Sequence, residues 1–263
     1  MSGVVTAYAP QVLVSAHRQV NSAQVNSRRP PEQTGCYDRR HGMPNAPLLS
    51  QRTSDDDFAR LIDEIRACRL CAAELPLGPR PIVRGRPEAR LLIISQAPGT
   101  RVHETGLSFD DRSGDRLRLW LGLDRETFYD ESRVAIMGMG FCYPGRDQSS
   151  GDRPPRPECA PLWHPRLRLH FREAALTLLV GSYAIRYYLP DRSRQSMTAS
   201  LSRWREFLPE YFVLPHPSWR TTAWERKNPW FTTELLPQLR AAVGKALGCR
   251  LNPPARCAPY PHR

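Results

Sequence analysis

The feature that most constrains the fold of this chain is a short apolar run followed directly by a polar turn that contains glycine. Residues 91–94 form the run, Gln96-Ala97-Pro98-Gly99 form the turn, and an amphipathic segment opens at Ser113. The pattern predicts a buried strand, a tight turn that exposes backbone N–H groups, an acidic loop and the start of a helix. Open α/β sheets bind ligands at the carboxyl ends of their strands, so this loop is a natural place for a site.

The rest of the chain repeats this alternation of strand and helix. Apolar runs predict strands at about 90–95, 133–139, 175–181 and 211–214, and helical patterns occupy 113–122, 161–171, 182–189, 198–207 and 229–247. A proline-rich connector at 75–87 and a long irregular loop at 140–159 interrupt them. We therefore predict a three-layer α/β/α sandwich with a four-stranded parallel sheet and right-handed crossovers.

The predicted domain covers residues 53–248 and opens with a helix capped by Ser54. Residues 1–52 are rich in Ser, Gln, Asn, Pro and Arg and have no sustained period, so we predict a flexible leader. Residues 249–263 are expected to form a loose tail.

The charge of the chain indicates a polyanionic partner, because the formal net charge is +12 and arginine supplies nearly all of the basic excess. No apolar run approaches the roughly 20 residues that a membrane span needs. The N-terminus also lacks a compact signal pattern. We expect a cytoplasmic monomer with no membrane association.

Four of the seven cysteines have the spacing of a metal or cluster site. Cys68 and Cys71 form a C-x-x-C pair, and Cys142 and Cys159 bracket the irregular loop that follows the second predicted strand. The spacing suits a [4Fe–4S] cluster as well as it suits structural zinc. Four thiols without a metal remain the alternative. The other three cysteines lie in the terminal segments, where we assign them no role.

Taken in their order along the chain, these motifs resemble the uracil-DNA glycosylase superfamily, most closely its iron–sulfur, family 4-like branch. The resemblance covers about residues 57–247. It rests on Cys68-x-x-Cys71, Gln96-Ala97-Pro98-Gly99, Gly106-Leu107-Ser108-Phe109, Cys142 with Cys159, and His216-Pro217-Ser218. It implies a DNA repair enzyme with a structural [4Fe–4S] cluster, in preference to zinc, and DNA with a flipped damaged base as the partner.

The resemblance also implies roles for individual residues. Phe109 matches the aromatic residue that stacks on the base, and Gln96, Ala97 and Gly99 offer a base-binding turn. His216 matches the histidine that donates a hydrogen bond to the leaving base. Ser218, Trp219 and Arg220 follow it as the expected DNA-binding segment, with the tryptophan as a wedge.

Two departures from the family pattern bear on activity. The acid of the classical enzymes is replaced by Ala97 and that of family 4 by Gln96, which leaves Glu104, Asp110 and Asp111 as candidates and His103 as a possible base. We favour His103 and Glu104, because the two aspartates have an alternative role in stabilising the helix end. The base-reading asparagine of family 4 is also missing, since residues 137–140 contain no amide.

Three functions compete on these grounds. The first is a glycosylase that hydrolyses the bond between deoxyribose and uracil or another damaged base. The second is a non-catalytic iron–sulfur protein of the same fold that binds nucleic acid, and the two departures favour it. The third is a zinc-stabilised hydrolase of small molecules that uses His103 and Glu104.

Overall fold

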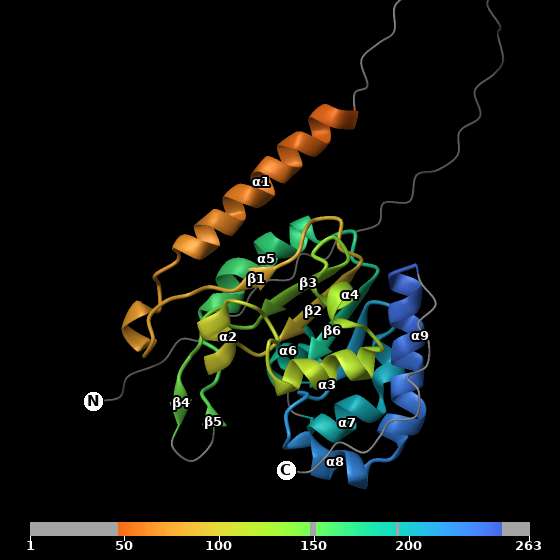
Figure 1. Ribbon diagram of the computed structural model, residues 1–263. Helices are drawn as coiled ribbons and strands as arrows, with labels where there is room; N and C mark the ends of the chain where they lie inside the picture. The colour runs from red at the N-terminus through yellow and green to blue at the C-terminus, as the bar shows by residue number, and fades with distance from the viewer. Residues whose placement is uncertain (1–46, 148–150, 193–194, 249–263) are drawn as a thin grey trace, which may run out of the picture. The chain divides into compact units, whose positions relative to one another are not determined.

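The computed structural model describes residues 47–147, 151–192 and 195–248. Its central sheet has five strands in the order β1-β3-β2-β6-β7. The strands are β1 (Val83–Arg84), β2 (Leu91–Ser95), β3 (Val134–Gly138), β6 (Leu176–Val180) and β7 (Tyr211–Leu214). The last four are parallel to one another and match the four predicted strands (Figure 1).

The prediction of a purely parallel, four-stranded sheet is wrong at one edge. Strand β1 pairs antiparallel with β3, with Val83 opposite Met137. It is only two residues long and lies in the proline-rich connector, where no alternating pattern can develop. The sheet is therefore mixed, whereas the predicted α/β architecture is confirmed.

Helices form the outer two layers, as predicted for a three-layer sandwich. They are α1 (Pro47–Ala67), α2 (Thr100–Thr105), α3 (Arg112–Leu121), α4 (Arg125–Tyr129), α5 (Cys159–His170), α6 (Ser182–Tyr188), α7 (Met197–Ser202), α8 (Thr221–Lys227) and α9 (Leu236–Ala246), the last preceded by a π-helical turn at Phe231–Leu235. Helices α3 and α9 pack together on one face, and α1 packs with α5 on the other (Figure 1). None of the described helices is long and apolar enough to cross a membrane.

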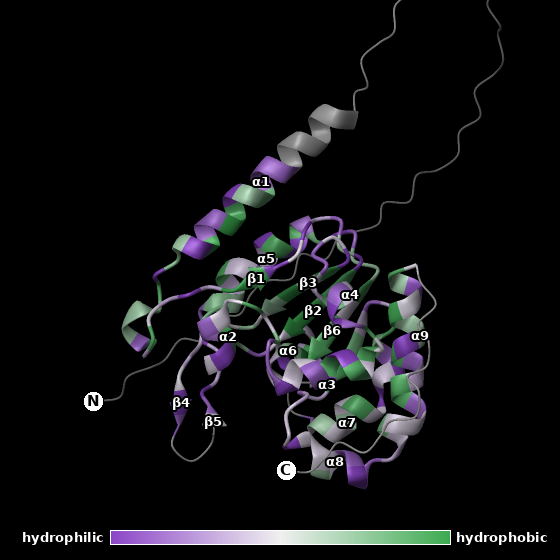
Figure 2. Ribbon diagram, in the orientation of Figure 1, coloured by the Kyte–Doolittle hydropathy of each residue, from purple (hydrophilic) through white to green (hydrophobic). Residues whose placement is uncertain are grey.

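The core explains why this arrangement is stable. Strands β2, β3 and β6 are buried along their whole length, as expected for parallel strands covered on both faces. Figure 2 shows these strands as uniformly apolar, whereas α3 alternates between apolar and polar residues. Leu117 and Leu121 form the apolar stripe of α3 and are fully buried.

Two predicted helix starts are wrong. Helix α1 begins at Pro47, before the predicted cap at Ser54. Helix α3 is capped by Asp111, whose side chain accepts from the Gly114 N–H at 2.9 Å, and Ser113 lies inside the helix. The first polar loop contains α2. Residues 1–46 and 249–263 lie outside the described part of the chain, so the leader and tail remain predictions.

The long loop at 140–159 is also more ordered than predicted. Two short strands, β4 (Arg146–Asp147) and β5 (Gly151–Asp152), pair antiparallel within it. Arg146 lies opposite Asp152 in this ribbon. Figure 1 shows the ribbon beyond α2, away from the central sheet. It places charged side chains where the sequence indicated only an irregular loop.

A buried histidine supports the carboxyl end of β3. His164 of α5 is 1% exposed. Its Nε2 lies 2.9 Å from the Gly138 carbonyl, and its Nδ1 lies 2.7 Å from the Tyr188 hydroxyl. Because a carbonyl oxygen can only accept, Nε2 carries the hydrogen and Nδ1 accepts from the tyrosine. Burial lowers the pKa of His164 to about 4, with the Arg168 charge adding to the shift and the hydrogen bond to Gly138 opposing it.

We expect this histidine to make the fold acid-sensitive. The unfolded chain takes up a proton at the ordinary histidine pKa of 6.5, whereas the folded chain does so only near 4. The stability is therefore fully present above about pH 6.5 and falls as the pH drops toward 4, by roughly 3 kcal/mol through this group alone. Urea unfolding of the wild type and of His164→Gln across this range measures the effect. If the free energy of unfolding changed equally with pH in the two proteins, the prediction would be contradicted.

Candidate functional site

A cavity of about 470 Å³ opens where β2, β3 and β7 end. The segments that follow these strands supply its walls together with the N-terminal cap of α3 and the β4–β5 ribbon. Eight of the predicted site residues line it: Gln96, Ala97, Gly99, Phe109, His216, Ser218, Trp219 and Arg220. The structure therefore brings together two loops that lie far apart in the sequence.

Phe109 forms an apolar wall in a strained conformation. Among the residues that the structure describes, it is the non-glycine residue whose φ is positive, at 58°. It is 8% exposed. Its ring meets Phe128 edge to face at a centroid distance of 6.1 Å, and its carbonyl accepts from the Tyr129 hydroxyl at 3.0 Å. Such backbone strain persists only where the surroundings enforce it, and it is often found at functional sites. The aromatic ring is thus held rigidly against the cavity.

His216 and Asp111 line the same cavity and influence each other electrostatically. Burial lowers the pKa of His216, and the nearby Asp111 carboxylate opposes that shift. The imidazole is therefore neutral at neutral pH and able to donate one N–H. Asp111 is held by its hydrogen bond to the Gly114 N–H. The pair combines a neutral donor with a fixed carboxylate in one cavity.

The β4–β5 ribbon adds a second carboxyl group at the mouth of the cavity. Burial of this group raises the pKa of Asp152, Asp111 adds to the shift, and Arg146 and Arg220 oppose it. A methyl group on Gly99 would lie 3.4 Å from the Asp152 carboxyl, so the ribbon closes over the turn after β2. The Arg220 guanidinium lies over Gly151. Asp152 and Arg146 were not predicted as site residues, since nothing in the sequence of an irregular loop indicates that they face the cavity.

The segment after His216 presents an aromatic side chain to solvent. Trp219 is 79% exposed although it lines the cavity mouth, and the Arg220 guanidinium lies 5.6 Å from its ring centroid. Trp219 is therefore accessible to a ligand at the rim of the cavity. Trp224 differs, because it packs against Trp230 and Phe231 and donates to Thr198.

His103 and Glu104, which the sequence analysis favoured for catalysis, do not line this cavity. Both lie in α2, where Arg80 donates hydrogen bonds to their backbone carbonyls. Glu104 is exposed, and the His103 ring packs beside Tyr143 at a centroid distance of 6.1 Å. Burial and the Arg80 charge lower the pKa of His103. The geometry therefore favours Asp111 over Glu104 as the acid of the site.

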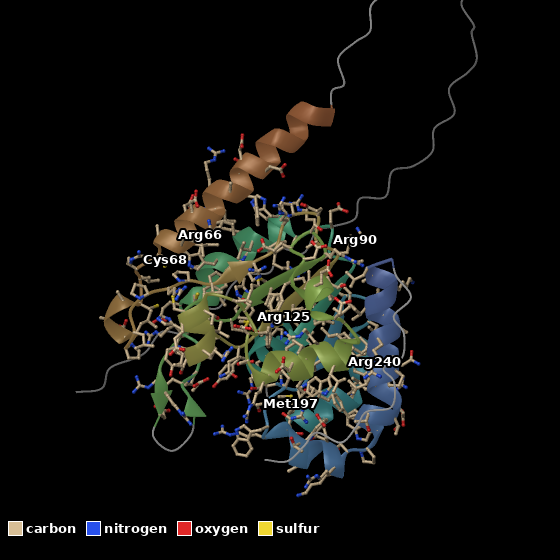
Figure 3. The ribbon with its side chains drawn as sticks, in the orientation of Figure 1. Arg66, Cys68, Arg90, Arg125, Met197 and Arg240 are labelled. Carbon is tan, nitrogen blue, oxygen red and sulfur yellow. The ribbon has the colours of Figure 1, made fainter. Side chains whose placement is uncertain are left out.

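The four predicted metal-binding cysteines line one small second cavity of about 30 Å³. Cys68 (labelled in Figure 3) and Cys71 follow the end of α1, whereas Cys142 follows β3 and Cys159 begins α5. Burial raises the pKa of Cys142 to about 11 and that of Cys159 to about 12. Thiols in such surroundings stay protonated unless a metal or another positive charge stabilises their anions.

The spacing of the four cysteines bears on which inorganic group they could hold. Within the described residues, no group of three or more His, Cys, Asp or Glu side chains is close enough to hold one. The thiolates of a tetrahedral zinc site lie about 4 Å apart, since each is about 2.3 Å from the ion. A cubane cluster binds each thiolate to a different iron and so needs wider spacing. Four cysteines around one cavity have the donor set that a cluster requires.

The chain matches the sequence model of a known protein family. The sequence model described as the uracil DNA glycosylase superfamily matches residues 82–240, which is more than half of the chain. The match runs from just before β1 into α9 and includes the segments that line the main cavity. Cys142 and Cys159 lie inside the matched range, whereas Cys68 and Cys71 lie before it.

Proposed function

The chain belongs to the uracil-DNA glycosylase superfamily, and from this premise we propose that it hydrolyses the N-glycosidic bond of uracil or another damaged base in DNA. The observation that supports this proposal most is the shared cavity of Phe109, Asp111 and His216. Its volume of about 470 Å³ lies within the range of pockets that enclose a small ligand.

The proposed mechanism begins with a base that has been extruded from the stack, because its glycosidic bond is inaccessible inside a duplex. The base stacks on Phe109. His216 donates its N–H to a carbonyl oxygen of the base, which stabilises the negative charge that develops as the bond to C1′ breaks. Asp111 balances the cationic sugar and accepts a proton from the water that attacks C1′. The electron pair of the broken bond leaves with the base.

The surface around the cavity suits a nucleic acid strand. Within the described residues, Arg146 and Arg220 take part in no ion pair, so both guanidinium groups remain available for phosphate. Trp219 is placed to insert beside the extruded base, as apolar and aromatic wedges do. Every residue in this scheme comes from one chain, so we propose that a monomer is sufficient. The cytoplasmic location stays a prediction from the sequence.

We also propose that the four cysteines hold a [4Fe–4S] cluster of structural role, as in the iron–sulfur branch of the superfamily. The cluster would tie the end of α1 to the start of α5 and to the loop after β3. Analysis of iron and acid-labile sulfide in anaerobically purified protein, with Cys142→Ser as the control, tests this proposal. Protein that contains neither, or zinc alone, would contradict it.

A non-catalytic nucleic-acid-binding protein is the alternative function. The absence of an acid at Gln96 and Ala97 favours it, whereas Asp111 in the cavity favours an enzyme. The two are separated by incubating the protein with single- and double-stranded oligonucleotides that contain uracil, hypoxanthine or an undamaged base, and scoring abasic sites. The enzyme is expected to produce abasic sites only at a damaged base. DNA binding without abasic sites at any base would support the alternative.

A further inference from the structure

The cavity depends on a side chain that does not line it. Arg116 of α3 extends to the segment after His216, where its guanidinium donates to the Ser218 carbonyl at 2.9 Å and to the Thr222 hydroxyl at 3.0 Å. It also forms an ion pair with Glu225 of α8 at 2.7 Å. Both members of this pair have side chains that are 18% exposed. A buried guanidinium with three partners holds them in a fixed geometry.

The contacts of Arg116 extend to His216 through α8. Thr221, the first residue of α8, donates its hydroxyl to the His216 carbonyl. Its neighbour Thr222 and, one turn later, Glu225 are the partners of Arg116. The backbone of His216 is therefore fixed to a short helix, and that helix is fixed to α3.

Helix α3 is itself well anchored. The Arg116 guanidinium lies over the Trp120 ring at 5.3 Å from its centroid, and Leu117 is fully buried between the layers. Arg240 of α9 donates to the Trp120 carbonyl at 3.2 Å near the other end of the helix (Figure 3). The N-terminal cap of the same helix is Asp111. One rigid element thus holds the carboxylate directly and the histidine through a chain of hydrogen bonds.

We propose that Arg116 is a positioning residue that sets the distance between Asp111 and His216. This inference rests on the proposed glycosylase function. Misplacement of a reacting group by about 1 Å is enough to lower a rate about 100-fold, so a loose His216 loop would affect chemistry before it affects binding. In the wild type, one guanidinium nitrogen of Arg116 bonds the Ser218 carbonyl and the Thr222 hydroxyl while a second nitrogen pairs with Glu225. Arg116→Lys keeps the positive charge but has a single nitrogen, so it cannot make the bonds to the Ser218 segment and the Glu225 pair in the same geometry.

The test compares two leaving groups. Fluorine at C5 withdraws electrons, so 5-fluorouracil departs as an anion more readily than uracil and needs the His216 hydrogen bond less. We expect Arg116→Lys to lower kcat about 10- to 100-fold for uracil and several-fold less for 5-fluorouracil, with KM for the oligonucleotide changed less than about 3-fold. In the His216→Ala background the same substitution is expected to have little further effect.

The matched control is Arg240→Lys, which loosens α3 at its far end without touching the His216 segment. It is expected to lower kcat only slightly, and by the same factor for both bases. If Arg116→Lys lowered kcat by the same factor for both bases, the inference would be overturned and Arg116 would have a purely structural role.

A second measurement does not depend on turnover. If Arg116 sets the distance to Asp111, Arg116→Lys lowers the pKa of His216 further, as followed by NMR titration of the imidazole. If Arg116→Lys left both the pKa of His216 and the ratio of kcat for uracil to kcat for 5-fluorouracil unchanged, the proposed role would be excluded. If the wild type excised none of the damaged bases tested but Arg116→Lys still lowered the pKa of His216, the glycosylase proposal would be contradicted and the positioning role retained.

Discussion

Replacing Asp111 with Asn is expected to lower kcat for base excision by about 100- to 10,000-fold, with folding nearly unaffected. The loss follows from removing the carboxylate that accepts the proton of water, a contribution of this size in general acid–base catalysis. Folding is preserved because asparagine caps a helix about as well as aspartate does, so the bond from the Gly114 N–H to the side-chain oxygen can remain. His216→Ala is expected to cost about 100- to 1,000-fold, the usual effect of losing one preorganised donor.

The matched controls are the two residues that the sequence favoured for the same task. Glu104→Gln and His103→Ala are expected to change kcat less than about 3-fold, because neither side chain lines the cavity. Single-turnover measurements on an oligonucleotide that the wild type cleaves would separate the chemical step from product release. If Glu104→Gln lost activity and Asp111→Asn kept it, the acid would have been assigned to the wrong loop.

Gly114→Ala is expected to destabilise the protein by about 3 kcal/mol and to abolish excision. A methyl group on Gly114 would lie 1.7 Å from the Phe109 carbonyl oxygen and 2.8 Å from the Phe109 Cβ. Both distances are far inside van der Waals contact, so the Phe109 loop must move away from α3. This movement would break the bond from the Tyr129 hydroxyl to the Phe109 carbonyl and displace the aromatic wall of the cavity.

Helix propensity and close packing predict opposite changes in stability for Gly114→Ala. Gly114 lies in α3, where helix propensity alone would make alanine more stable than glycine by about 1 kcal/mol. Denaturant unfolding of the variant therefore distinguishes local propensity from close packing. Gly99→Ala is the control from the same cavity, because its methyl group would meet the Asp152 carboxyl at an ordinary 3.4 Å. Its stability is expected to fall by no more than about 1 kcal/mol, because Gly99 is the N-cap residue of α2 and alanine is the poorer cap. If Gly114→Ala were more stable than the wild type, the close contact between residue 114 and the Phe109 carbonyl would be refuted.

Much of the fold could be predicted from the sequence. The four parallel strands stand where their apolar runs predicted them, because strands buried on both faces must be continuously apolar. Helices α2, α4 and α8, strand β1 and the β4–β5 ribbon were missed. Each helix or strand among them has at most seven residues, which is too short for a periodic pattern to emerge above its neighbours.

The site was predicted in part. The turn after β2, Phe109 and the segment from His216 to Arg220 meet in one cavity because they follow strands whose carboxyl ends share one edge of the sheet. The sequence could not rank the three acids of the first loop. Glu104, Asp110 and Asp111 are close neighbours in the chain, and only the left-handed turn at Phe109 and the start of α3 decide which one faces inward.

The sequence by itself determined the alternation of strands and helices, the two loops of the site and the four cysteines. All of these follow from local hydrophobic period and residue type. Only the tertiary structure decided that Asp111 faces His216, that Asp152 closes the mouth, and that Arg116 joins α3 to α8. Those contacts join segments as much as about 100 residues apart, and the packing of one helix against another fixes their distances, which local sequence patterns do not encode.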